Sequence, residues 1–358
     1  SMTAFTFVDE PDTITPELHA HPFLGIDTEF IREKTFFAHL CLLQIATQDR
    51  IYCVDPLAGN PMQSFWEKTF EKTWVVHSAR QDIEVIFQTA GAMPATLFDT
   101  QIAAALLGMQ PQIGYAGLVK ELFGVDIPKT HTRADWSQRP LPDALLHYAV
   151  EDVEYLLPAY ELLGERLEKA GRKEWAEQDS QLLLDESLYD VDETQAVHRL
   201  KGARNLRGRR RSAAERLAVW REAEAAARNR PRQWILRDNA LLEIALELPE
   251  TMAALQRIDG LPGKLADRAG GKLLAIVAQS ADDDHDYRPP AAPNDRQKKL
   301  LKTMQTAVAN CARELGISPE LIAPRKELSA AILMGTTDSR VFRGWRRELI
   351  GEQLLGLL

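Results

Sequence analysis

The segment Leu24-Gly-Ile-Asp-Thr-Glu-Phe30 places two acidic residues at the end of an apolar stretch. The turn-prone Pro22 precedes it, so we expect a short β-strand here. Side chains at positions i and i+2 of a strand point to the same face. Asp27 and Glu29 would therefore project side by side, where like charges repel unless a cation neutralises them. Alone, the pair is more typical of a solvated strand end, and other carboxylates must join it to make a metal site.

The sequence around this strand predicts an α/β domain. Three further strands are expected, at residues 40–46, 50–54 and 74–77. The connection Thr47-Gln-Asp49 is short enough for a hairpin, so the first two should be antiparallel neighbours. Helical spacing of apolar residues follows over residues 80–90, and Gly91 is a typical stop. After Asp99 the pattern becomes helical, which predicts that the domain ends near residue 170.

Two later segments add acidic residues. Asp82 falls at the start of the expected 80–90 helix, where the helix dipole stabilises a carboxylate by roughly 0.3–1 kcal/mol. Tyr148 and Asp152 have i, i+4 spacing, which puts them on one face of a helix expected over residues 141–163. Pro158 should kink or split that helix. A helix-start acid and a packing tyrosine are the ordinary alternatives for Asp82 and Tyr148.

The conjunction of these residues points to two-metal phosphodiester hydrolysis. That chemistry needs carboxylates from separate elements to converge on two ions about 3.5–4 Å apart. The predicted set is Asp27, Glu29, Asp82, Tyr148 and Asp152. An all-oxygen site suits Mg²⁺ or Mn²⁺. A tyrosine has an ordinary pKa near 10, so Tyr148 is better suited to orient the attacking water than to act as a base.

The fragments together resemble the exonuclease motifs of the DEDD superfamily, in its tyrosine-bearing subgroup. More narrowly, the whole chain resembles bacterial ribonuclease D. The segments that fit in order are Asp27-Thr-Glu-Phe30, Leu42-Leu-Gln-Ile45, His77-Ser-Ala79 with Asp82, Phe98-Asp-Thr-Gln101, Asp135-Trp-Ser-Gln-Arg-Pro-Leu141 and Tyr148-Ala-Val-Glu-Asp152.

The resemblance implies a ribonuclease H-like fold, with a mixed sheet flanked by helices, and a 3′→5′ exoribonuclease that releases nucleoside 5′-monophosphates. The resemblance also implies that the partner is RNA. The expected substrates are structured precursors, and in particular the 3′ ends of tRNA precursors. In this interpretation Asp27, Glu29 and Asp152 hold the water-activating ion. Asp27 bridges to a second divalent cation, which Asp82 reaches directly or through water.

Five further residues are candidates for substrate contact. Phe30 and Trp136 could stack on terminal bases without sequence specificity. Arg139 could bind a phosphate oxygen, Gln44 a sugar or base edge, and His77 a phosphate. The alternatives are core aromatics, a surface salt bridge, an ordinary polar strand residue and a partly buried histidine that ends a strand.

The chain beyond residue 170 is helical in pattern. The resemblance implies two copies of the helicase-and-RNase-D C-terminal (HRDC) domain, and Leu255-Gln-Arg-Ile-Asp-Gly260 fits the first. Ile235 and Leu241 recur at equal spacing as Ile322 and Leu328, which is typical either of a tandem duplication or of two unrelated amphipathic helices. The expected parts are an exonuclease domain (1–170), a helical connector (171–211), a first HRDC domain (212–281), a proline-rich linker (282–293) and an HRDC-like domain (294–358).

Composition sets the broad class. The 358 residues are 45% hydrophobic and 27% charged, as in soluble globular proteins, and no apolar run is long enough for a membrane span. The N-terminus lacks the pattern of a signal peptide. Three cysteines without a CxxC pair fit a reducing compartment, so we expect a cytoplasmic protein. For the oligomeric state, we favour a monomer.

The net charge of −9 argues against coating nucleic acid by bulk electrostatics. The basic run Arg199–Arg211 is either a local phosphate-binding stripe or a solvated connector. Two other functions stay open. A DNA proofreading or repair exonuclease could use the same acids, and a non-catalytic nucleic-acid-binding module would not need to keep them clustered.

Overall fold

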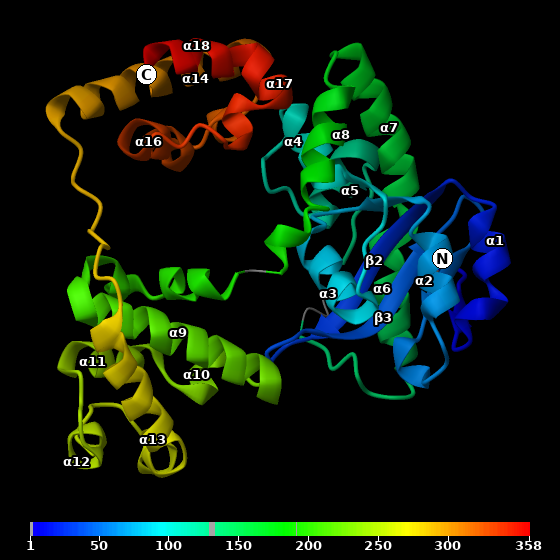
Figure 1. The fold of residues 1–358 in the computed structure, drawn as a ribbon. Helices are drawn as coiled ribbons and strands as arrows, with labels where there is room; N and C mark the ends of the chain where they lie inside the picture. Colours follow the sequence, from blue (N-terminus) through cyan, green and yellow to red (C-terminus); the bar gives the residue numbers. More distant parts are fainter. Residues whose placement is uncertain (1–2, 129–132, 191) are drawn as a thin grey trace. The chain divides into compact units, whose positions relative to one another are not determined.

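The computed structural model describes residues 3–128, 133–190 and 192–358, which fall into two compact units (Figure 1). The first unit comprises Ser1–Ile31, His39–Asp185 and Pro293–Leu358, and the second comprises Arg32–Ala38 and Glu186–Ala292. Among the residues that the structure describes, each helix is too short or too polar to cross a membrane.

The first unit is built on a mixed six-stranded sheet in the order β1-β4-β3-β2-β5-β6. Its strands are β1 (Thr6–Val8), β2 (Phe23–Ile31), β3 (His39–Ala46), β4 (Ile51–Val54), β5 (Thr73–Val76) and β6 (Thr96–Asp99). β2 and β3 pair antiparallel, as do β3 and β4, whereas β1 pairs with β4, and β5 with β2 and β6, in parallel. The α/β prediction and the four expected strands are confirmed. β1 and β6 were not predicted, because each contains only two apolar residues in succession and therefore shows too little pattern to be recognised.

Helices of this domain lie around the sheet. They are α1 (Thr15–His19), α2 (Gln63–Thr69), α3 (Arg80–Ala90), α4 (Thr100–Leu106), α5 (Tyr115–Phe123), α6 (Asp143–Glu154), α7 (Leu156–Lys169) and α8 (Lys173–Leu182). The helix predicted over residues 80–90 is confirmed, and Gly91 ends it in the left-handed region with φ 72°. The helix expected over 141–163 is two helices that meet at Tyr155. Pro158 lies in the first turn of α7, where its missing N–H needs no partner.

Two packing contacts fix the strand that carries the acidic pair. α6 packs against β2, β3 and β4, and its Leu145, Ala149 and Val150 share a buried cluster with Cys41 and Leu42 of β3. On β2, a Cβ added at Gly25 would lie 3.1 Å from the Cβ of Leu156. The glycine therefore lets α7 approach β2 closely.

The second unit is a helical domain. Its helices are α9 (Gly208–Arg228), α10 (Arg232–Ile235), α11 (Asp238–Glu247), α12 (Met252–Gln256) and α13 (Gly263–Gln279). Ala196, Val197, Leu200 and Ala203, from the 3₁₀ turns before α9, are buried in its core. The connector expected over residues 171–211 is therefore divided: α8 belongs to the first unit, and the chain from Glu186 belongs to the second.

The C-terminal helices belong to the first unit. They are α14 (Asp295–Leu315), α15 (Pro319–Ile322), α16 (Arg325–Met334), α17 (Gly344–Arg346), which continues as a π-helical turn (Arg347–Gly351), and α18 (Glu352–Leu357). Residues 284–294, which include most of the predicted linker, form neither helix nor strand.

A tandem duplication is visible in the helix boundaries. α14, α15 and α16 each begin 87 residues after α9, α10 and α11 (208 and 295, 232 and 319, 238 and 325) and have the same lengths of 21, 4 and 10 residues. The left-handed residue after α9, Asn229, corresponds to Gly316, and Leu248 after α11 corresponds to Gly335. Two unrelated helical segments would not share these boundaries, so the duplication interpretation is supported.

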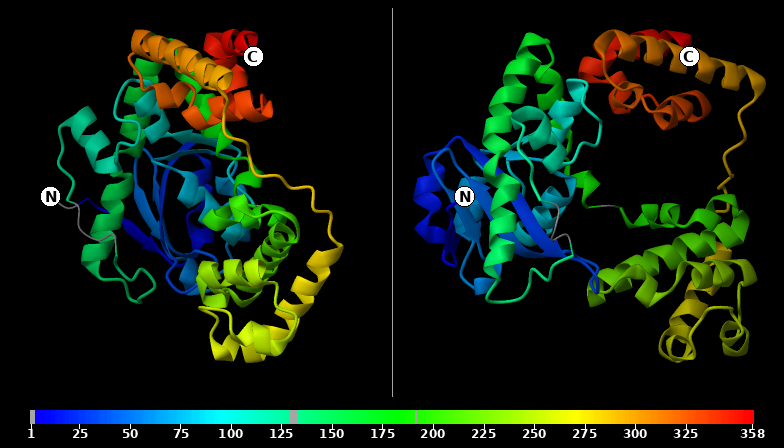
Figure 2. Two further views of the ribbon diagram at one scale, coloured as in Figure 1. Left: turned by 90° about the vertical axis from the view of Figure 1, so that its left-hand side faces the viewer. Right: turned by 180° about the vertical axis from the view of Figure 1, so that it is seen from behind.

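The C-terminal helices lie beside the helices of the exonuclease domain (Figure 2). They are attached to α8 through a buried polar and aromatic contact. The indole rings of Trp175 and Trp345 stack with centroids 4.3 Å apart. Both Nη atoms of Arg346 donate to the carboxylate of Asp179 at 2.7 Å, and Trp345 Nε1 donates to the same carboxylate at 3.0 Å. Arg346 is only 2% exposed, so this pair is shielded from water.

Candidate active site

Three acidic side chains of the first unit converge at the sheet. Asp27 and Glu29 project from β2 and Asp152 projects from α6, and one carboxylate oxygen from each lies within 4.8 Å of the others. All three are half-buried. The i, i+2 alternation of the strand brings the first two together, and the packing of α6 on β2 brings the third.

Gln44 of β3 donates hydrogen bonds to two of these three carboxylates. It lies opposite Asp27 in the β2–β3 register and is fully buried. Its Nε2 donates to Glu29 Oε1 at 3.1 Å, to the carbonyl oxygen of Ala149 at 3.2 Å and, at 3.4 Å, to Asp27 Oδ2. Its Oε1 is buried and has no hydrogen-bond partner among the described residues. These contacts make Gln44 a support for the carboxylates, and its contact with a sugar or base edge stays a prediction.

Asp82 approaches from α3. It is buried, and its Oδ1 accepts a hydrogen bond from the hydroxyl of Thr28, the residue between the two acids of β2. It lies outside the group of three, yet its charge contributes to raising the pKa of Asp27, after burial. Burial raises the pKa of Asp82 itself to about 7.

The electrostatics of the cluster favour bound cations. Burial, followed by the charges of neighbouring carboxylates, raises the pKa values of Asp27 and Glu29 well above their ordinary range. Burial and the charge of Glu151 raise the pKa of Asp152 to about 7. Negative charges held this close are unfavourable without a counter-charge. The donor set is all oxygen, which fits hard divalent cations such as Mg²⁺ or Mn²⁺.

Tyr148 lies one helical turn before Asp152. Burial, with the charges of Asp152 and Glu29, raises its pKa to about 12, so the phenol stays protonated at neutral pH. A protonated phenol can donate a hydrogen bond, and the water-orienting role of Tyr148 stays a prediction.

His77 and Phe30 are two of the five candidates for substrate contact, and both lie at or near the end of a strand. Both ring nitrogens of His77 are engaged, Nδ1 at 2.8 Å from the hydroxyl of Thr100 and Nε2 at 2.7 Å from the carbonyl oxygen of Ile113. These contacts match the interpretation of His77 as a partly buried histidine at a strand end. Phe30 is half-buried and follows Glu29 on β2, just beyond a register shift between the two residues.

Trp136 and Arg139 are engaged within the domain. Trp136 is 3% exposed and belongs to the cluster under α6. The guanidinium of Arg139 binds both oxygens of Asp55, at 2.8 and 3.2 Å, and donates to the carbonyl oxygen of Cys41 at 2.6 Å. The contacts of Trp136 favour the alternative of a core aromatic. Arg139 does form a salt bridge, but with the buried Asp55 and not at the surface as the alternative had it.

One supporting residue was not predicted. The buried carboxylate of Asp99 accepts hydrogen bonds from the backbone N–H groups of Ser78 and Ala79, at 3.0 and 2.8 Å, and of Gln101, at 2.9 Å. It thereby ties the turn before α3 to the start of α4. An aspartate directly before a helical pattern is a typical N-cap, and this signal could have identified it.

The mixed sheet, with carboxylates gathered from a central strand and two helices, defines a nuclease of the exonuclease type. Residues 3–168 match the 3′-5′ exonuclease family, and residues 210–277 match the HRDC domain. The chain belongs to the ribonuclease D family. It is 36% identical to ribonuclease D of Gluconacetobacter diazotrophicus, over 98% of this chain and 91% of that protein. It is 34% identical to ribonuclease D of Pseudomonas paraeruginosa, over 96% and 93%.

A solved structure supports the whole architecture. The crystal structure of Escherichia coli RNase D, described as an exoribonuclease involved in structured RNA processing, matches with a TM-score of 0.91 and 27% identity over 99% of both chains. The expectation of an exonuclease domain followed by helical domains is thereby confirmed.

Proposed function

We propose that this 3′-5′ exonuclease removes nucleotides from the 3′ ends of structured RNA precursors, tRNA precursors among them, and releases nucleoside 5′-monophosphates. The observation that carries the proposal is the convergence of Asp27, Glu29 and Asp152 within 4.8 Å, with Asp82 close enough to raise the pKa of Asp27. The preference for structured RNA is supported by the similarity to Escherichia coli RNase D, an exoribonuclease involved in structured RNA processing.

In this proposal each residue has a defined task. Asp27, Glu29 and Asp152 would hold one divalent cation, and Asp27 would hold a second together with Asp82, which would reach it directly or through water. Bound cations supply Lewis acidity and lower the pKa of a coordinated water. Tyr148 donates a hydrogen bond that orients the attacking water, because its raised pKa keeps it protonated. Gln44 keeps the two carboxylates of β2 at fixed positions.

A direct test compares matched RNA and DNA strands. A tRNA precursor with a 3′ extension, and a DNA strand of the same sequence, would be incubated with Mg²⁺ or Mn²⁺ and with EDTA. We expect stepwise shortening of the RNA, release of nucleoside 5′-monophosphates and no reaction in EDTA. Dominant cleavage of the DNA would replace the proposal with the repair-type alternative, and metal-dependent turnover of either strand would exclude a non-catalytic binding module.

Asp27→Asn tests the site itself. Removing a ligand shared by both cations should cost several kcal/mol of transition-state stabilisation, and hence slow hydrolysis roughly a thousandfold or more. The thermal unfolding curve should still show a folded protein. The matched control is Asp49→Asn, in the exposed turn between β3 and β4, which should retain full activity. Near-normal turnover by Asp27→Asn would refute the assignment.

A further inference from the structure

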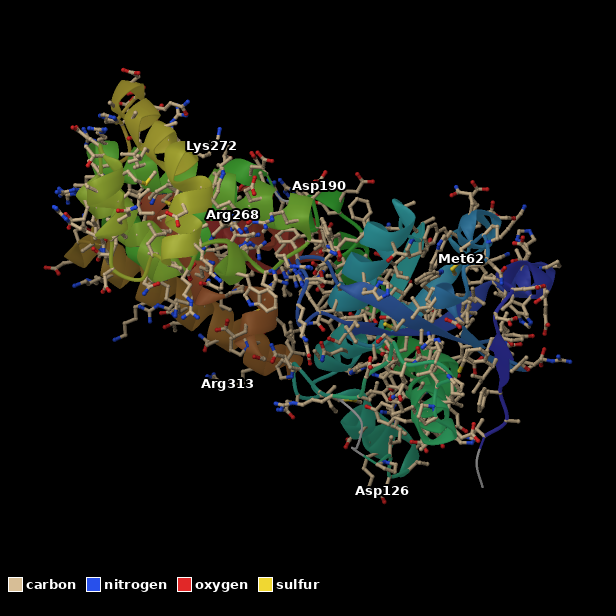
Figure 3. All side chains as sticks on the ribbon, turned by 90° about the horizontal axis from the view of Figure 1, so that it is seen from below. Met62, Asp126, Asp190, Arg268, Lys272 and Arg313 are labelled. Atoms are coloured by element: carbon tan, nitrogen blue, oxygen red, sulfur yellow. The ribbon has the colours of Figure 1, made fainter. Side chains whose placement is uncertain are left out.

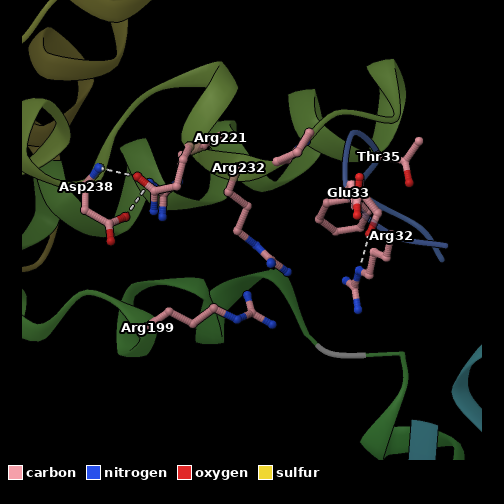
Figure 4. Close-up of a pocket in the computed structure, with 10 residues that line it drawn as sticks. Arg32, Glu33, Thr35, Arg199, Arg221, Arg232 and Asp238 are labelled. Carbon is pink, nitrogen blue, oxygen red and sulfur yellow. Dashed lines mark hydrogen bonds and ion pairs between the residues drawn. The ribbon is translucent and has the colours of Figure 1, made fainter. Parts of the chain in front are cut away.

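A basic pocket lies within the second unit, where the tip of the β2–β3 hairpin meets the helical domain (Figure 4). Its volume is about 530 Å³, within the roughly 300–1,000 Å³ of small-molecule sites. The residues that line it include Arg32, Glu33, Phe36, Arg199, Arg232 and Asp238.

The hairpin side of the pocket is fixed to the helical domain. Asn229 ends α9 with φ 47°, and its Oδ1 accepts hydrogen bonds from the backbone N–H groups of Phe36 and Phe37, at 3.1 and 3.0 Å. The guanidinium of Arg232 lies 4.8 Å above the ring of Phe36. The pocket wall is therefore held by hydrogen bonds and a cation–π contact.

The positive charge of the pocket is only partly balanced. Arg232 makes a bidentate pair with Glu222, at 2.6 and 2.7 Å, and Arg199 Nη1 lies 3.2 Å from the same carboxylate. Two cations therefore share one anion. The fourth lining arginine, Arg221, is buried and paired with Asp238 at 2.6 Å, so it is a structural member of the wall.

Arg199 and Arg232, which share the carboxylate of Glu222, remain accessible to solvent. The side chains of Arg199 and Arg232 are 39% and 25% exposed, and Figure 4 shows them reaching toward the hairpin, across from Arg32. A planar guanidinium binds a phosphate oxygen pair in a fixed geometry and is the preferred group for such anions. At the hairpin tip, Phe37 is 38% exposed and packs edge-on against Phe36, which offers an aromatic surface.

The duplication shows that the helical frame does not need these charges. At the equivalent positions 87 residues later, Arg221, Glu222 and Arg232 are replaced by Val308, Ala309 and Pro319. The corresponding helices α14 and α15 nevertheless form with the same lengths. The charged group is therefore a property of the first copy and not a requirement of the fold.

We propose that this pocket binds a phosphodiester group of single-stranded RNA upstream of the 3′ end, with Arg199 and Arg232 as donors to the phosphate and Phe37 as a stacking surface for a base. An arginine groove with interleaved aromatics is the usual way to hold a single strand without sequence specificity. The site rests on the proposed function, since it supplies a second anchor for the same substrate.

The test measures RNA binding without turnover. The affinities of a labelled trinucleotide and of a 15-nucleotide RNA would be measured over a range of salt concentrations, with every variant made in the inactive Asp27→Asn background. Arg199→Gln should weaken binding of the long RNA about tenfold, the effect of one lost charged hydrogen bond, and lower the slope of log affinity against log salt by about one. Binding of the trinucleotide, which in this proposal is held by its 3′ end at the acidic site, should not change. Glu222 keeps Arg232 as its partner, so the variant should fold.

The controls separate the pocket from general electrostatics. Arg268→Gln removes the same charge from the exposed face of α13, outside the pocket (Figure 3), and should have a smaller effect. Arg199→Lys keeps the charge without the planar fork and should recover part of the affinity. An unchanged affinity in Arg199→Gln, or an equal loss in Arg268→Gln, would overturn the proposal. Failure of the proposed function would appear instead as absence of RNA hydrolysis by the unmutated protein.

Discussion

Gln44 is the residue whose position says most about how the acidic site is built. Its amide nitrogen faces three acceptors, two of them carboxylate oxygens, so its orientation is determined by the charges above it. Partners of this kind orient metal ligands and tune their affinity. The amide compensates part of the negative charge and fixes the spacing of Asp27 and Glu29.

Gln44→Met should test this role, because methionine has similar length and no donor. We expect the affinity for Mn²⁺, measured by titration calorimetry, to fall about 10- to 100-fold while the protein stays folded. Gln63→Met, on the exposed face of α2, is the matched control. Unchanged Mn²⁺ affinity in Gln44→Met would show that the glutamine is only a packing residue.

The raised carboxyl pKa values predict how stability depends on pH and metal. A carboxyl group whose pKa rises on folding stabilises the folded state while protonated and loses that contribution as it ionises. In EDTA, stability should therefore decline from pH about 4 to about 7, where Asp82 and Asp152 titrate, by a few kcal/mol in order of magnitude. Added Mn²⁺ should raise the melting temperature more at pH 7.5 than at pH 5, because protons compete with the ion. Calorimetric scans at both pH values measure this, and an equal shift at both would contradict it.

The acids could be predicted from the sequence, whereas the substrate contacts could not. Spacing along a strand predicts that Asp27 and Glu29 share a face, whereas Asp152 was joined to them only by the combination of motifs and the family resemblance. Whether an aromatic or an arginine is exposed depends on distant partners. Asp55 occupies Arg139 from 84 positions away, and no local pattern signals that pair.

At the scale of elements, Asp99 connects three of them. It ends β6, caps α4 and binds the turn that leads into α3, the helix that carries Asp82. One buried carboxylate thus satisfies backbone donors that would otherwise be left without partners.

Asp99→Ala should lower the free energy of unfolding by about 2–4 kcal/mol, because it removes a cap and leaves buried N–H groups unpaired. Urea unfolding gives this value. Asp143→Ala, at the exposed start of α6, removes only a dipole interaction and should cost about 1 kcal/mol or less. Similar losses in both variants would mean that Asp99 acts as an ordinary helix-start acid.

Elements with a long, regular apolar pattern were predicted almost to the residue, as α3 shows. The division of α6 from α7 was only an alternative, because Pro158 fits equally well in a kink or a first turn. The choice is made by tertiary packing: Tyr115 Oη accepts a hydrogen bond from the backbone N–H of Tyr155, where the two helices meet.

At the scale of the whole molecule, the two copies of the duplicated helical segment, which begin at α9 and α14, have different surroundings. The second copy belongs to the unit of the exonuclease domain through Arg346, Trp345 and Asp179, whereas the first forms the core of its own unit. The proline-rich linker between them was predicted from composition. The attachment of the second copy could not be, because its residues meet across 167 positions of sequence.

Arg346→Ala should destabilise this attachment by about 3–5 kcal/mol, since it leaves the buried carboxylate of Asp179 unpaired. Limited proteolysis should then release fragments cut between residues 284 and 294 sooner, and the denaturation midpoint should fall. Arg347→Ala removes a neighbouring exposed ion pair with Glu352 and should cost about 1 kcal/mol or less. If the two variants resisted proteolysis equally, the ion pair between Arg346 and Asp179 would contribute little to the attachment.

The near-parallel indoles of Trp175 and Trp345 have an optical consequence. Chromophores this close couple electronically, so their ultraviolet circular dichroism and emission differ from those of isolated tryptophans. The circular dichroism and emission of this pair therefore report whether the C-terminal helices are bound to α8, without any added dye or label.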